Sequence, residues 1–125
     1  LLPSGCKTLP LEAISDIDFI IPGEGSNYDI GRILRTAGVR PRVKYSVSDD
    51  YAAVAMAEGG LGMTIVPELI LKGIGGNRAA VELEPACTRT IGIAERSIGT
   101  GSPACAAFMR FTENWVKRHS EDAIQ

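Results

Sequence analysis

Apolar residues along the chain follow two different spacings, one typical of helices and one typical of strands. Residues 26–38 carry apolar side chains every three or four positions, which places them on one face of a helix. These side chains are Ile30, Ile33, Leu34 and Ala37. Residues 42–48 instead alternate between apolar and polar, which predicts a half-buried strand. Its buried side is expected to carry Val43, Tyr45 and Val47.

The same patterns predict the other elements in an alternating order. Helices are predicted over residues 9–17, 26–38, 49–58, 67–73 and from 102, and strands over 18–22, 42–48, 61–67, 81–85 and 89–96. Gly59 and Gly60 are expected to end one helix, and Gly62 to allow a close backbone approach in the next strand. This alternation predicts an α/β fold, with a mainly parallel sheet flanked by helices.

Composition narrows the class of protein. The chain has 125 residues, 45% hydrophobic and 22% charged, which suits one ordinary globular domain. Its formal net charge is -2 and its basic residues are scattered, so we expect no nucleic-acid contact by this part of the protein. Its apolar runs are too short to span a membrane, and its start lacks the pattern of a signal peptide. We therefore expect a cytoplasmic location.

Residues that commonly carry catalysis or bind metals are sparse. The single histidine, His119, lies in a polar tail where we expect it to be exposed and not held against a nucleophile. Cys6, Cys87 and Cys105 are far apart, and no C-x-x-C pair, P-loop or EF-hand pattern occurs. We therefore expect neither an enzyme nor a cofactor or metal site in this chain.

The loop over residues 22–31 follows the order strand, Gly-x-Gly, helix start, as in phosphate-binding turns. Tyr28 stands where a dinucleotide-binding loop would have its third glycine, which disfavours that function. Two interpretations remain open. The helix start, with Ser26 and Asn27, holds a small anion, or the loop is a plain capped turn.

A second turn of the same kind follows the strand over 42–48. Ser48 lies at the carboxyl end of this strand, and either Ser48 or Asp49 caps the next helix. In open α/β sheets, ligands bind outside the carboxyl ends of the strands. The Ser26 turn, the Ser48 turn and the end of the strand over 61–67 are therefore expected to share one edge and form a binding site.

Four stretches within residues 9–116 together carry a resemblance to a known family. In order they are "LPLEAISDIDFIIPGEG", "GVRPRVKYSVSDDYAAVAMAEGGLGMTIVPE", "VELEPACTRTIGIAERS" and "SPACAAFMRFTENW". They resemble the effector-binding domain of bacterial LysR-type transcriptional regulators. Each motif is short, and their common order and spacing carries the resemblance.

This resemblance implies the fold of type 2 periplasmic binding proteins, in which a small effector lies between two α/β lobes. Residues 1–90 would be the second lobe, and residues 91–125 a return strand and a C-terminal helix. The first lobe and the N-terminal winged helix-turn-helix are expected to be absent. Whether the chain is a shortened fragment, a proteolytic remnant or a truncated gene product stays open. The full-length protein is expected to be a homo-oligomer, whose usual dimer contact needs the first lobe.

The resemblance also implies which residues contact the effector, expected to be a carboxylate or another small anion. They are Gly25, Ser26, Asn27, Ser48, Asp49, Met63 and Thr64. DNA would be contacted only through the absent N-terminal domain, and a membrane not at all. The family's peroxide-sensing branch has a reactive cysteine near the first turn, and this chain has none between Cys6 and Cys87.

Two other functions compete with the regulator. One is a lobe of a transport solute-binding protein, which predicts a secretion signal. The other is an enzyme on the same fold, for which Asp49 and Asp50 are the strongest local candidates.

Overall fold

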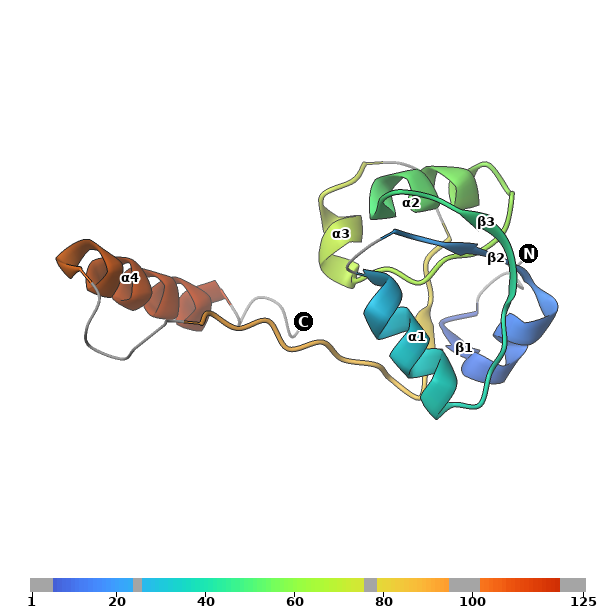
Figure 1. Cartoon of the computed structure of the whole chain (residues 1–125), viewed down its shortest axis with the longest axis horizontal. Coiled ribbons are helices and arrows are strands. Elements are labelled where there is room, and N and C mark those ends of the chain that lie inside the picture. The colour runs from blue at the N-terminus through green and yellow to red at the C-terminus, as the bar shows by residue number, and fades with distance from the viewer. Residues whose placement is uncertain (1–5, 24–25, 76–78, 95–101, 120–125) are drawn as a thin grey trace. The chain divides into compact units, whose positions relative to one another are not determined.

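The computed structural model describes residues 6–23, 26–75, 79–94 and 102–119 (Figure 1). The chain divides into two compact units, Leu1–Arg89 and Thr90–Gln125, which we call unit 1 and unit 2. Unit 1 contains all the strands described here, and unit 2 contains the last helix.

The order of elements follows the predicted alternation. Unit 1 contains β1 (Thr8–Pro10), the 3₁₀ helix η1 (Leu11–Asp16), β2 (Asp18–Ile21), α1 (Ser26–Thr36), β3 (Arg42–Ser46), α2 (Asp50–Glu58), α3 (Glu68–Lys72) and β4 (Glu82–Glu84). Unit 2 contains α4 (Pro103–His119). The predicted helices, β2, β3 and β4 are thus confirmed, with the helix over 9–17 taking 3₁₀ form. Parallel strands and flanking helices confirm the α/β class.

β2 is the central strand of unit 1. It pairs in parallel with β3 from Asp18 opposite Arg42 to Ile21 opposite Ser46. On its other edge, the N–H of Ile20 donates to the carbonyl of Met63 at 2.8 Å, in a parallel bridge. The strand predicted over 61–67 is therefore reduced to this bridge. Because the pairing is parallel, the chain leaves β2 and β3 at the same edge.

β1 was not predicted, because it exists through a partner distant in sequence. It pairs in parallel with β4, with Leu9 opposite Leu83. The N–H of Glu82 also donates to the carbonyl of Lys7 at 3.0 Å. Residues 7–10 are thus fixed beside residues 82–84 by backbone hydrogen bonds, with no local pattern to signal it.

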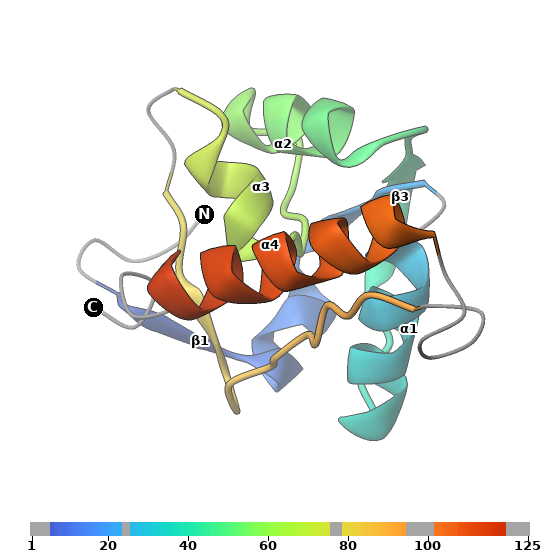
Figure 2. The same cartoon turned by 90° about the vertical axis from the view of Figure 1, so that its left-hand side faces the viewer.

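The core explains why β2 reads as an unbroken apolar run. Figures 1 and 2 show α1 and α2 on opposite sides of β2 and β3. Phe19 and Ile20 are both 0% exposed, and successive side chains of a strand point to opposite faces. Phe19 clusters with Ile30 and Leu34 of α1. Two buried faces therefore require two adjacent apolar residues.

Two strand predictions were wrong. Val43 is 49% exposed instead of buried. β3 has β2 on one side only, and the pairing shifts between Phe19 and Ile20, which interrupts the expected alternation. Residues 89–94 form no strand and are exposed, since they pair with no strand in the described part of the chain. The rest of that predicted strand, 95–96, lies outside the described residues.

α4 begins as the sequence predicts. The Ser102 hydroxyl accepts a hydrogen bond from the N–H of Cys105 at 3.3 Å. Large apolar side chains of α4 are exposed, with Phe111 62% exposed. The polar tail is helical at least to His119, where α4 ends. His119 is exposed but held, since its ring stacks on Trp115 with centroids 4.2 Å apart.

An ion-pair cluster joins the starts of β2 and β3. Asp18 lies 2.7 Å from Arg42 and 2.8 Å from Lys44. The hydrogen bond from Lys44, together with the positive charge of Arg42, lowers the pKa of Asp18 below its ordinary value of 3.8. Because the pKa is lower in the folded state, the cluster stabilises the fold above about pH 4 and stops doing so as pH falls through the folded-state pKa.

Asp18→Asn is therefore expected to lower the thermal midpoint at pH 7, and this difference from the parent should shrink towards zero near pH 2. The measurement is thermal unfolding followed by circular dichroism across that range. Asp16→Asn, at an exposed position in η1, is the control for loss of a carboxylate. A difference that stays constant with pH would show that the Asp18 charge does not cause it.

Candidate functional site

The turns that leave β2 and β3 are in direct contact. The N–H of Val47 donates to the carbonyl of Ile21 at 3.1 Å, which continues the strand pairing past its last ladder position. Beyond it, the Ser48 backbone lies where a Cβ on Gly23 would be, so Gly23 fits only because it has no side chain. Figure 1 shows that α1 and α2, on opposite faces of β2, both begin near its carboxyl end.

We call this region the strand-end edge, and define it by Gly23, Ser26, Asn27, Ser48, Asp49 and Thr64. The structure thus brings together the two turns that the sequence predicted to share an edge. Gly23 was not among the predicted site residues. Its sequence signal is its place as the first glycine of the Gly-x-Gly in the loop over residues 22–31, directly after the buried Pro22.

Asp49, and not Ser48, caps α2. Its carboxylate accepts a hydrogen bond from the N–H of Ala52 at 2.9 Å, and its backbone is extended, as an N-cap requires. The exposed Ser48 hydroxyl donates to the other carboxylate oxygen of Asp49 at 3.3 Å. Asp49 therefore already compensates the positive end of α2, which leaves Ser48 as the more available polar group.

The start of α1 lies next to Gly23. Ser26 is its first residue, and Gly25 lies outside the described residues. Asn27 is exposed, and its N–H donates to the carbonyl of Gly23 at 3.4 Å. The first-turn carboxylate, Asp29, pairs with Arg89 at 3.4 Å.

Met63 and Thr64 differ in their surroundings. The Met63 side chain packs against the apolar core of unit 1. The Thr64 hydroxyl is buried and has no hydrogen-bond partner among the described residues. Leaving such a group unsatisfied costs about 1–3 kcal/mol. Met63 thus has a structural role in the fold, whereas the Thr64 hydroxyl lacks a structural explanation.

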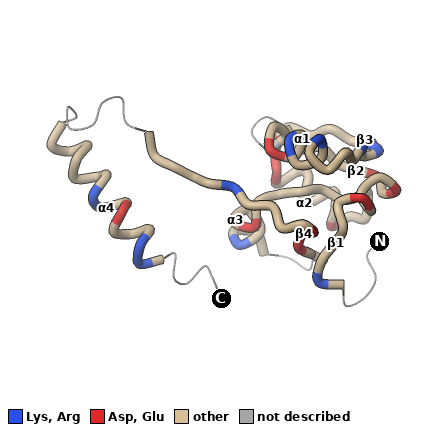
Figure 3. Tube along the Cα trace, turned by 90° about the horizontal axis from the view of Figure 1, so that it is seen from below, with Lys and Arg blue, Asp and Glu red and all other residues tan. Residues whose placement is uncertain are grey.

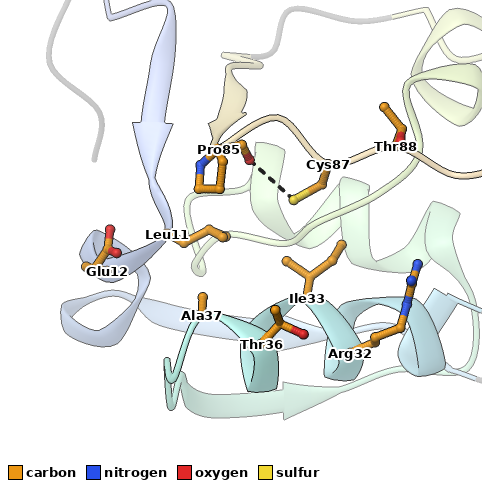
Figure 4. Close-up of a pocket in the computed structure, with 9 residues that line it drawn as sticks. All are labelled: Leu11, Glu12, Arg32, Ile33, Thr36, Ala37, Pro85, Cys87 and Thr88. Atoms are coloured by element: carbon orange, nitrogen blue, oxygen red, sulfur yellow. Dashed lines mark hydrogen bonds between the residues drawn. The ribbon is translucent and has the colours of Figure 1, made fainter.

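A separate pocket of about 440 Å³ lies in unit 1 beside the later turns of α1 (Figure 4). Its lining comes from η1, α1 and the segment after β4, namely Leu11, Glu12, Arg32, Ile33, Thr36, Ala37, Pro85, Cys87 and Thr88. The sequence did not predict it, because these three segments are distant in sequence and meet through the pairing of β1 with β4 and the ion pair between Asp29 of α1 and Arg89.

Charge and thiol chemistry give little sign of other sites. Figure 3 shows Lys and Arg distributed over α1, β3, α3 and α4 and mixed with Asp and Glu, unlike the clustered cations of a nucleic-acid-binding face. The three cysteines are free thiols. Within the described ranges, no group of three or more His, Cys, Asp or Glu residues is placed to hold a metal ion. None of the helices described here has the length and apolar character needed to cross a membrane.

Comparison with known proteins gives one result. The family model described as the LysR substrate binding domain matches residues 2–117. Neither the curated proteins nor the solved structures gave a match.

Proposed function

We propose, because this chain belongs to the LysR substrate-binding domain family, that its strand-end edge binds a small anionic effector. Domains of this family are the effector-binding parts of LysR-type transcriptional regulators, which act together with a DNA-binding domain. The observation that supports this location is the packing of Gly23 against the Ser48 backbone. It holds the first turns of α1 and α2 beside each other.

The anion is expected over the first turn of α1. The first N–H groups of a helix have no partner within the helix and carry partial positive charge. At α2 this charge faces the Asp49 carboxylate, whereas at α1 the first-turn carboxylate Asp29 is paired with Arg32 and Arg89, so α1 offers the better position. The Ser48 hydroxyl bonds to Asp49 at a long 3.3 Å and is exposed, so it can turn to donate to a ligand.

Thr64 is the second proposed contact. It directly follows Met63, which bridges to Phe19 and accepts the N–H of Ile20 in β2. A ligand oxygen, or a water molecule that the ligand orders, would satisfy its buried hydroxyl. Gly25, Ser26, Asn27 and Met63 remain predicted contributors to the same site.

The mechanism we propose is a population shift between two lobe arrangements in the cytoplasm. Residues 1–90 would form one wall of an interlobe cleft, and residues 91–125 would return to the other lobe. A ligand changes such an equilibrium only by its difference in affinity for the two arrangements. Contacts from both lobes to one anion would provide that difference and move the attached DNA-binding domains.

Ser48→Ala is expected to weaken carboxylate binding about tenfold, because one hydrogen bond to a charged group contributes roughly 1.5 kcal/mol. The stability of the unliganded protein should stay the same, since the hydroxyl is exposed. The measurement is isothermal titration of benzoate and succinate into a form of the protein that carries both lobes.

Ser46→Ala is the matched control, because it also removes an exposed serine hydroxyl, two residues earlier at the end of β3. An unchanged affinity in Ser48→Ala would remove Ser48 from the site. Thr64→Val adds a second readout: weaker binding without loss of stability supports a ligand contact, whereas a loss of stability indicates a structural water. Micromolar binding of benzoate or succinate by the 125-residue chain alone, weakened by Ser48→Ala, would contradict the interlobe location.

A further inference from the structure

We propose that the pocket beside α1 binds a second small ligand, an apolar molecule that ends in a carboxylate. The pocket lies along the later turns of α1, from Arg32 to Ala37, whereas the strand-end edge lies at the start of this helix. Its volume of about 440 Å³ is in the range of sites for small molecules. All the residues that line the pocket belong to unit 1.

The middle of the pocket is apolar. Leu11 is 2% exposed, and Ile33 and Ala37 pack against the core of unit 1 from their half-buried positions. Figure 4 shows the side chains of Leu11, Ile33 and Cys87 directed towards the same space. A compact aromatic or aliphatic body placed here would remove their remaining apolar surface from water.

One end of the pocket has positive charge to spare. Arg32 is 3.8 Å from Asp29, whose other carboxylate oxygen lies 3.4 Å from Arg89. Two guanidinium groups thus share a single carboxylate, which leaves one net positive charge in this cluster. The Arg32 side chain is 57% exposed, so its planar donors are accessible to a carboxylate in paired geometry.

The polar groups also fix the orientation of the ligand. The hydroxyl-bearing residues Thr36 and Thr88 line the pocket together with Arg32. Figure 4 shows Glu12 at the opposite end from Arg32, where its negative charge disfavours an anion. The carboxylate therefore belongs at the Arg32 end, with the apolar body running towards Leu11.

The test uses 4-phenylbutyrate as the probe, titrated into the 125-residue chain by isothermal calorimetry. One saturable site is expected, and 4-phenylbutanol, which has no charge, should bind at least about tenfold more weakly. Arg32→Gln should cause a similar loss of phenylbutyrate affinity. Arg35→Gln is the matched control, because Arg35 is an exposed arginine of the same helix that does not line the pocket.

Cys87 gives an independent readout. Its thiol is exposed on the pocket wall and donates to the Pro85 carbonyl at 3.3 Å. Bound phenylbutyrate should slow its alkylation by iodoacetamide severalfold and leave the alkylation rate of Cys105 unchanged. This readout needs no substitution, so it does not depend on whether a variant folds.

Ala37→Trp should fill the pocket and abolish binding, provided that circular dichroism shows a folded protein. Absence of saturable binding, or equal affinities in Arg32→Gln and Arg35→Gln, would overturn the proposal. It would also be overturned if phenylbutyrate left the alkylation of Cys87 unchanged. A change in oligomeric state on Ala37→Trp, with phenylbutyrate binding intact, would assign the pocket to a second copy of the chain instead.

Discussion

Gly23→Ala is expected to separate the two turns of the strand-end edge and to lower the free energy of unfolding of unit 1 by about 1–3 kcal/mol. The added Cβ would overlap the carbonyl oxygen and carbon of Ser48. These are backbone atoms, so relief requires a shift of the whole turn and not a side-chain rotation. The shift would move Ser48 and the start of α2 away from α1.

Effector binding should therefore fall further in Gly23→Ala than in Ser48→Ala, which removes a single hydrogen bond. The measurements are urea unfolding followed by circular dichroism and carboxylate titration in the two-lobed protein. Gly31→Ala is the control, because Gly31 lies inside α1, where alanine should raise stability by about 0.5–1 kcal/mol. Parental stability and affinity in Gly23→Ala would show that the two turns are not held together by this contact.

Gly23→Ala disturbs one contact, that of Gly23 with the Ser48 backbone. A plain capped turn would not have this contact with a second turn. Either helix start alone is an ordinary end of a helix. The contact between Gly23 and the Ser48 backbone brings the turn before α1 against the turn before α2. This proximity was foreseeable from the sequence, because parallel strands leave a sheet at the same edge. The atomic contact that maintains it was not.

The sequence could predict the features that depend on the spacing of residues a few positions apart. The apolar face of α1, with Ile30 and Leu34, packs on the core as its helical spacing indicates. Gly59 caps α2, and Gly60 follows with a φ of +77°, so the glycine pair ends this helix as predicted. These features need only neighbours within a few positions, which is why periodicity and turn residues reveal them.

The sequence could not predict the features that depend on contacts with residues distant along the chain. β1 exists because β4 pairs with it, and the strand expected over 61–67 is limited to Met63 by what lies beside it. The exposure of Val43 follows from its position on an edge strand, which alternation alone does not reveal. The pocket beside α1 was not predictable for the same reason, because its lining comes from segments far apart in the sequence, from residue 11 to residue 88.

The site residues divide in the same way. Residue type identified Ser48 and Asp49 as candidates to cap α2. The choice between them depended on which side chain accepts the hydrogen bond from the N–H of Ala52. Asp49 makes that bond and is fixed by it. Thr64 was selected by resemblance, and what the structure adds is that its hydroxyl is buried with no hydrogen-bond partner among the described residues.

Gly62→Ala is the second change with a large expected effect. A Cβ at this position would overlap the carbonyl oxygen of Asp18, which accepts the 2.9 Å hydrogen bond from Met63. The Ile20 side chain lies only 3.4 Å from the same Cβ, whose position is fixed by the backbone, so relief requires movement of the chain itself. We expect a loss of about 2–3 kcal/mol, at the upper end of overpacking effects, because the overlapping atom is backbone.

The predicted loss has a local signature. The N–H of Ile20 donates to the Met63 carbonyl, so hydrogen exchange at this amide should accelerate more than at the amides that β3 protects. Gly59→Ala is the control three residues earlier, where the φ of -71° suits any residue and stability should change by less than about 0.5 kcal/mol. If the Ile20 amide exchanged at the same rate in Gly62→Ala as in the parent, the Met63 bridge would not depend on the absence of a side chain at position 62. A loosened bridge would also displace Thr64, so carboxylate affinity should fall together with Ile20 protection, which ties the stability of this bridge to the proposed site.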